Sequence, residues 1–156
     1  MTSCKARIIG VGQALGGDDG AGLAVLRRLR ETAPPEIELV EVAEPSQLIA
    51  LLTDGAQRIV VVDALLDSGA AGRVVAIDPS VAKIGGRSLS SHGISLLEAI
   101  ELARIIAPEN IAPKIAIIGI TIRRPTIHGQ QLSASVEAAV GKAAAQALRL
   151  AQRPNA

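Results

Sequence analysis

The stretch Ile8–Gly22 reads IIGVGQALGGDDGAG and covers most of the first predicted strand and the turn after it. An aliphatic strand followed by a glycine-rich turn and a helix N-terminus normally binds anions, because backbone N–H groups and the positive end of the helix dipole point outward. Here Asp18 and Asp19 occupy that position and would repel a phosphate. The first two glycines of a dinucleotide fingerprint are present, but the third position holds Leu15. The stretch therefore favours a cation site over a nucleotide site.

Length and composition limit the class of protein. The 156 residues suit one domain, 1–156, that buries a full core. A formal net charge of +1 and the absence of Phe, Tyr and Trp argue against nucleic-acid and anionic-membrane partners. The single cysteine, Cys4, excludes an internal disulfide. The chain reaches its first strand too early for a signal peptide, and no apolar run approaches the roughly 20 residues of a membrane span. We expect a cytoplasmic protein.

Apolar runs alternate with amphipathic segments along the whole chain, which indicates an α/β domain. The predicted strands are Ala6 to Gly12, Ile37 to Ala43, Arg58 to Leu65, Arg73 to Ile77 and Lys114 to Ile122. The predicted helices are Gly20 to Thr32, Ser46 to Leu52, Leu96 to Ile106 and Ser133 to Arg153. Ser95 and Glu98 form a capping box, so the third helix should begin just after Ser95.

The link between the third and fourth strands is short. Leu66 to Gly72 cannot form a parallel crossover, which needs a dozen or more residues. Strand four should therefore run antiparallel to strand three and be the only antiparallel strand, with a hairpin turn at Asp67-Ser68-Gly69. The long segment from Pro79 to Ser91 must then return to the edge where strands one and three end. That edge is where open α/β sheets bind ligands.

Three side chains are expected to converge on this edge. Asp19 follows strand one, Asp63 ends strand three and His92 lies just before the third helix. Two carboxylates and an imidazole suit Zn, Ni, Mn or Fe, and three protein ligands leave positions open for a substrate. Each residue also has a purely structural interpretation. Either aspartate of the turn could cap the first helix, and His92 could be an ordinary loop histidine.

Asp63 is the hardest of the three to explain by structure alone. It lies within the aliphatic run Val60 to Leu66, and a buried carboxylate there must meet a cation, hydrogen-bond donors or water. Nucleophilic candidates are weaker. Ser90 and Ser91 adjoin His92 only in sequence, and no Gly-x-Ser-x-Gly motif occurs. His128 is expected to be solvated.

At these residues the sequence resembles the hydrogenase maturation proteases, endopeptidases that trim the C-terminus of a [NiFe]-hydrogenase large-subunit precursor. The motifs are Gly10 to Gly22, Val61 to Ala64, Leu89 to Gly93 and the tail Leu132-Ser133-x-x-Val136, so the resemblance spans nearly the whole chain. One position departs from the pattern, because the family's usual Asn is Gln13 here.

The resemblance implies a three-layer α/β/α sandwich around a five-stranded mixed sheet, a phosphorylase/hydrolase-like fold. It also implies that Asp19, Asp63 and His92 bind nickel carried by the precursor, or zinc or another divalent ion in its place. The enzyme would be a nickel-dependent endopeptidase, either aspartic-type or metal-assisted, with Asp19 or Asp63 as the base that activates water. Whether the metal polarises the scissile carbonyl or only positions it stays open.

Two alternatives from other classes remain at this stage. One is a non-catalytic nickel-sensing or chaperone-like module for hydrogenase assembly, in which Gln13 marks lost activity. The other is a nucleotide-binding α/β domain, which Leu15 and the two aspartates disfavour. Cleavage of the precursor, or stabilisation by a nucleotide, would separate these alternatives.

Overall fold

The computed structural model describes residues 5–13, 16–67, 69–81, 95–123 and 131–154. Its strands are β1 (Ala6–Val11), β2 (Ile37–Val42), β3 (Arg58–Leu66), β4 (Val74–Ile77) and β5 (Lys114–Ile122). Its helices are α1 (Ala21–Arg30), α2 (Leu48–Leu52), α3 (Leu96–Ile106) and α4 (Ala134–Gln152), with 3-10 turns η1 (Gly17–Gly20) and η2 (Pro45–Gln47). Every strand begins and ends within one residue of its predicted bounds.

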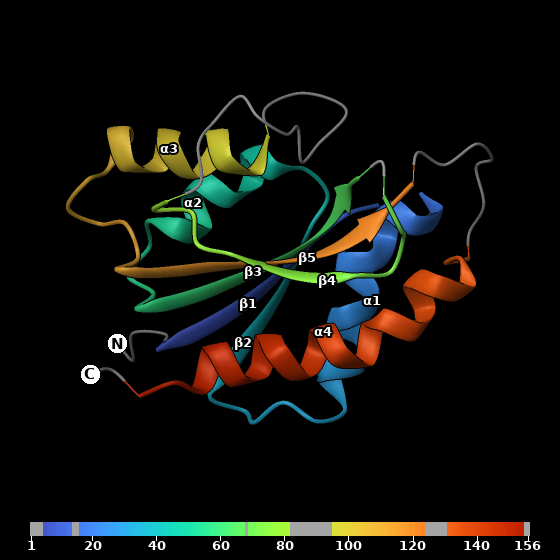
Figure 1. Cartoon of the computed structure of the whole chain (residues 1–156). Helices are drawn as coiled ribbons and strands as arrows, with labels where there is room; N and C mark the ends of the chain where they lie inside the picture. The colour runs from blue at the N-terminus through green and yellow to red at the C-terminus, as the bar shows by residue number, and fades with distance from the viewer. Residues whose placement is uncertain (1–4, 14–15, 68, 82–94, 124–130, 155–156) are drawn as a thin grey trace.

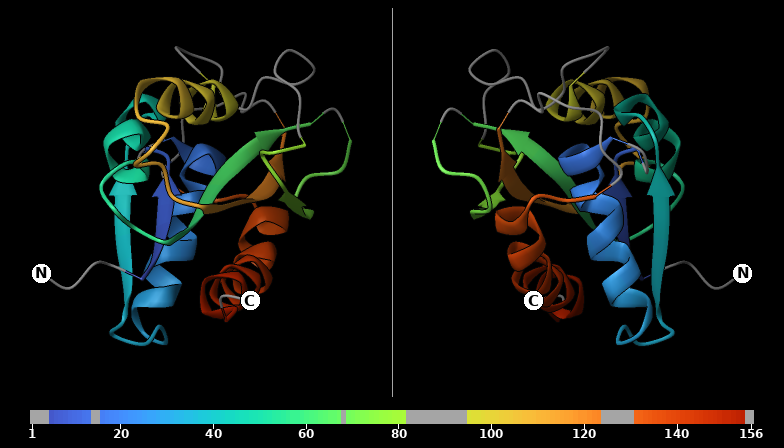
Figure 2. Two further views of the ribbon diagram at one scale, coloured as in Figure 1. Left: turned by 90° about the vertical axis from the view of Figure 1, so that its left-hand side faces the viewer. Right: turned by 90° about the vertical axis from the view of Figure 1, so that its right-hand side faces the viewer.

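The five strands form one mixed sheet in the order β2-β1-β3-β5-β4. Strands β1, β2, β3 and β5 are parallel, and β4 is antiparallel to β5. Helices α1 and α4 cover one face, whereas α2 and α3 cover the other (Figures 1 and 2). The predicted three-layer α/β/α architecture is confirmed. Among the described residues, no helix has both the length and the apolar character of a membrane span.

Strand β3 lies in the middle of the sheet, and its aliphatic run is explained by burial on both faces. Val60 and Val62 pack with α1 and α4, whereas Ile59 and Val61 pack with α2 and α3. Side chains alternate along a strand, so the next position on the α2–α3 face is Asp63. The fold thus places a carboxylate in a row of core side chains.

The orientation predicted for β4 is correct, but its predicted hairpin with β3 is wrong. β5 lies between them, and β4 pairs only with β5 within the described chain. The link from β3 to β4 crosses the end of β5 instead: Asp67 N–H donates to Ile122 O at 3.1 Å, and Gly72 N–H donates to Thr121 O at 2.7 Å. Thr121 Oγ1 accepts from Arg73 N–H at 2.8 Å and donates to Ala70 O at 2.8 Å. These bonds to β5 come from residues far along the chain, so local turn chemistry could not reveal them.

Two local predictions around this link and the next helix are confirmed. Asp67 is a turn residue, because its Oδ1 accepts from Gly69 N–H at 3.1 Å. Helix α3 begins after Ser95, whose Oγ accepts from Glu98 N–H at 3.2 Å. The predicted return of Pro79 to Ser91 is described only as far as Val81.

Candidate functional site

The glycine-rich turn after β1 is shaped around the backbone of Asp19. Gly12 has φ of +154°, and a Cβ there would lie 2.4 Å from Asp19 O. A Cβ on Gly16 would lie 3.0 Å from Asp19 Cβ and 3.7 Å from its carboxylate oxygen Oδ2. The backbone closes the turn, with Gly16 N–H donating to Gln13 O at 3.0 Å and Asp19 N–H donating to Gly16 O at 3.1 Å. The turn therefore uses the main chain of Gln13, while its side chain is exposed.

A third glycine brings the first helix against the ends of the strands. A Cβ on Gly22 would lie 2.4 Å from Val62 O and 2.5 Å from Val11 O, both of them backbone atoms. Only glycine permits this approach, because real Cβ atoms do not come so close to a carbonyl oxygen. The contact fixes η1 and α1 beside the last residues of β1 and β3. It sets the position of Asp19 relative to Asp63.

Asp63 is a buried carboxylate, 8% exposed, near the end of β3. Its Oδ1 accepts from the N–H of Ala64 at 2.8 Å. Burial among aliphatic side chains raises the pKa of Asp63 well above its usual value, while the Ala64 N–H lowers it and the negative charge of Asp19 raises it further. The contribution of Asp19 indicates that the two carboxylates are electrostatic neighbours. Such a pair is stabilised by a cation or by a shared proton.

Within the described chain, no group of three His, Cys, Asp or Glu side chains is assembled that could hold a metal ion. His92 lies outside the described residues, so its place beside Asp19 and Asp63 stays a prediction. Cys4, Ser90, Ser91 and His128 also lie outside the described residues, so the weaker roles expected for them stay predictions. The structure thus brings the two aspartates to one edge of the sheet, with oxygen donors that suit hard or borderline divalent ions.

Asp18 does not cap the first helix, the structural role that the sequence allowed for it. Neither η1 nor α1 has a side-chain hydrogen bond at its N-cap. Instead, Asp18 Oδ1 accepts from the backbone N–H of Ser133 at 2.7 Å, which ties the turn to the start of α4. A carboxylate there also interacts favourably with the positive N-terminal end of the α4 helix dipole. The sequence held no signal for this contact, since the two residues are 115 positions apart.

Asp18→Ala is expected to lower the free energy of unfolding by about 1 kcal/mol, because the backbone N–H of Ser133 loses its charged acceptor. Urea unfolding measures this loss. Asp18→Asn is the matched control: it keeps an acceptor oxygen and should lose about half as much. Hydrogen exchange at the Ser133 amide should become faster in Asp18→Ala. Equal stability and unchanged Ser133 exchange would contradict the assignment.

The class of protein follows from comparison with known families. A sequence profile described as "Hydrogenase maturation protease" (HycI) matches residues 24–150. The chain belongs to this family of proteases, which hydrolyse peptide bonds. The matched residues include Asp63 and His92, whereas Asp19 precedes them. A search of curated protein sequences finds no significant match.

Solved structures of hydrogenase maturation proteases share the fold. HybD from Thermococcus kodakarensis is 29% identical, with a TM-score of 0.75 over 95% of this chain and 99% of that protein. HycI from Thermococcus kodakarensis KOD1 is 22% identical, with a TM-score of 0.73 over 96% of this chain and 94% of that protein. HybD from E. coli is 20% identical, with a TM-score of 0.72 over 91% and 88% of the two chains. The two structures under 25% identical show a shared fold alone.

Proposed function

We propose that this protein removes the C-terminal extension of a [NiFe]-hydrogenase large-subunit precursor that already carries nickel. Asp19, Asp63 and His92 would contact that nickel, so that only a loaded precursor is cut. The nickel arrives as part of the substrate, and zinc or another divalent ion could take its place in vitro. The cytoplasm, where such a precursor would be assembled, is the proposed compartment.

The observation that carries this proposal is the buried carboxylate of Asp63 beside that of Asp19. Two neighbouring carboxylates, one of them nine-tenths buried, repel each other unless positive charge lies between them. A divalent ion supplies that charge. His92 is three residues before Ser95, and three extended residues span at most about 11 Å. Because α3 packs on the same face of the sheet as Val61 and Leu65, which flank Asp63 on that face, this reach supports His92 as the third ligand.

The roles of the side chains follow from their surroundings. Asp63 pairs with Gly119 of β5 and follows Val62, the last residue of β3 that pairs with β1, so the sheet positions its backbone. Asp19 is exposed, and the nearby position 16 is glycine, which adds no side chain beside its carboxylate. Either carboxylate could take a proton from the attacking water, and the raised pKa of Asp63 makes its ionised form a stronger base than an ordinary aspartate. Bound nickel would supply positive charge next to the scissile peptide.

The test is cleavage of the precursor followed by intact-mass spectrometry. Nickel-loaded and nickel-free precursor are incubated with the protein under the same conditions. We expect the loaded precursor to lose one C-terminal fragment and the nickel-free precursor to keep its mass. A stable complex with uncut loaded precursor would favour the nickel-sensing or chaperone-like alternative.

His92→Ala is expected to weaken binding of Ni²⁺ by at least about tenfold and to slow cleavage of loaded precursor in parallel, because one of three ligands is lost. Isothermal titration with Ni²⁺ measures the affinity. His128→Ala is the matched control, since it removes the other histidine of the chain. Equal affinities for wild type and His92→Ala would exclude His92 as a ligand.

A further inference from the structure

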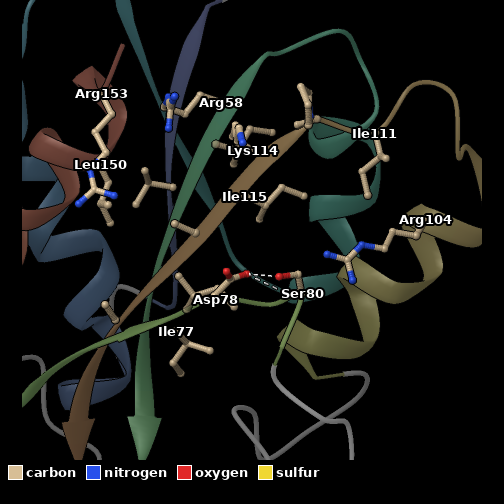
Figure 3. Close-up of a pocket in the computed structure, with 17 residues that line it drawn as sticks. Arg58, Ile77, Asp78, Ser80, Arg104, Ile111, Lys114, Ile115, Leu150 and Arg153 are labelled. Atoms are coloured by element: carbon tan, nitrogen blue, oxygen red, sulfur yellow. Dashed lines mark hydrogen bonds between the residues drawn. The ribbon is translucent and has the colours of Figure 1, made fainter. Parts of the chain in front are cut away.

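A groove of about 620 Å³ lies at the end of the sheet where β3 and β5 begin. Asp63 lies toward the other end of β3. Figure 3 shows Arg58 and Lys114 at the starts of these strands, with Asp78 and Ser80 where the chain leaves β4. Arg104 of α3 and Arg153 after α4 complete its polar lining. The proposed protease site uses none of these residues.

The groove is lined in part by the start of β5, on the side where no neighbouring strand of the described chain pairs with it. β4 pairs with Ile117 to Ile120 of β5 and ends at Ile77, so it leaves the first three residues of β5 without a neighbour on that side within the described chain. Thr121 directs its N–H and C=O toward the β4 side, where they bond Arg73 O and Gly72 N–H. Backbone groups alternate along a strand, so Ile115 directs its N–H and C=O to the same side. An open strand edge is a template for pairing with an extended peptide.

The charge around this edge is positive. Lys114 and Arg153 are exposed, and Arg104 is only partly compensated by Glu101, whose carboxylate lies 3.6 Å away. The one acidic side chain among the lining residues, Asp78, accepts from Ser80 N–H at 2.9 Å and from Ser80 Oγ at 2.7 Å. The pKa of Asp78 is lowered, first by these Ser80 bonds and also by the charges of Arg104 and Lys114. The groove therefore favours an anionic occupant.

Exposed apolar side chains follow two of the lining residues along the chain. Ile105 and Ile106, 68% and 65% exposed, follow Arg104 on α3, and Val81, 77% exposed, follows Ser80. A small inorganic anion would not use the open backbone of Ile115, whereas an extended protein segment would pair with it. The stretch 82–94 that follows Val81 carries Lys83 and Arg87 and no acidic residue, so its charge does not complement the groove.

We propose that this groove binds an extended acidic segment of a partner protein, which adds a short strand beside Ile115 of β5. Its backbone would exchange hydrogen bonds with Ile115. Acidic side chains on one side of the added strand would meet Lys114 and Arg153, and those on the other side would meet Arg104. The groove would thus be a docking site separate from the cleavage site.

Binding of a fluorescent peptide measured by anisotropy tests this docking site. The probe is an eight-residue peptide in which glutamate alternates with valine. We expect saturable binding that weakens with added salt, because exposed charges are screened. Lys114→Glu and Arg104→Glu should each weaken binding about fivefold, since reversing a charge replaces an attraction by a repulsion. Lys142→Glu is the matched control, an exposed lysine in the middle of α4 that should bind as the wild type does.

Two further measurements separate strand addition from simple anion binding. A peptide with N-methylated backbone amides should bind at least about fivefold more weakly, because it cannot complete the strand pairing. Hydrogen exchange at the Ile115 amide should slow when the unmodified peptide is bound. Equal binding of the N-methylated peptide, competition by inorganic phosphate at equal potency, or equal binding by Lys114→Glu would each overturn the proposal. Because no precursor is used, these results do not depend on whether the protein cleaves one.

Discussion

Asp63→Asn is expected to slow cleavage of the nickel-loaded precursor by at least about 100-fold, because the change removes the ionised oxygen needed to bind a metal or accept a proton. The change is nearly isosteric, and the amide oxygen can still accept from Ala64 N–H as Asp63 Oδ1 does. Circular dichroism should therefore show an unchanged fold. Glu31→Gln is the matched control, an exposed acid at the end of α1 that should cleave at the wild-type rate. Wild-type cleavage by Asp63→Asn would reject a role for this carboxylate.

The same variant should be more stable than wild type at neutral pH. Burial raises the pKa of Asp63 in the folded state above the ordinary value of 3.8 that it has when unfolded. Between these two pKa values the folded state binds more protons than the unfolded state, so the free energy of unfolding falls as pH rises. Above both pKa values the free energy of unfolding no longer changes with pH and stays at its lowered value. The amide of the variant has no charge to desolvate. The Tm of Asp63→Asn should thus exceed that of wild type at pH 7, and the difference should shrink as pH falls toward 4.

Gly22→Ala is expected to destabilise the protein by about 3 kcal/mol, because its Cβ would enter the backbone of two strands at once. The nearest atoms are Val62 O at 2.4 Å and Val11 O at 2.5 Å, and neither can move without shifting the sheet. Denaturant unfolding measures the loss. The usual preference of helices for alanine over glycine would predict the opposite sign.

Gly141→Ala in α4 provides the matched control for that substitution. Its Cβ would meet only the flexible end of Arg28, at 3.7 Å. Replacing a helical glycine there should raise the free energy of unfolding by about 1 kcal/mol. Two glycine-to-alanine changes in two helices should therefore have opposite signs. A Gly22→Ala variant within about 0.5 kcal/mol of wild type would show that the helix does not hold η1 where the structure places it.

Much of the fold was predictable because it follows from local pattern. The run Val60 to Leu66 marks a central strand, and Asp63 stands out only because its neighbours are aliphatic. Ser95 and Glu98 mark the start of α3 in the sequence itself. The direction of β4 followed from the length of its connection to β3.

The neighbours of these elements were not predictable from local pattern. The place of β5 between β3 and β4 depends on strand pairing across the sheet, and Thr121 accepts from Arg73 and donates to Ala70, both about 50 positions earlier. The partner of Asp18, Ser133, is 115 positions away. The basic groove unites residues from strands and helices that meet only in the folded sheet. Tertiary proximity of this kind leaves no periodic or spacing signal.

The most direct test of the central claim is a crystal of this protein grown with Ni²⁺ and measured at the nickel absorption edge. We expect one anomalous peak at the end of β3, with oxygens of Asp19 and Asp63 and a ring nitrogen of His92 within about 2.0–2.3 Å of it. Side chains of the three residues more than about 10 Å apart, or nickel bound elsewhere with this edge of the sheet empty, would contradict it.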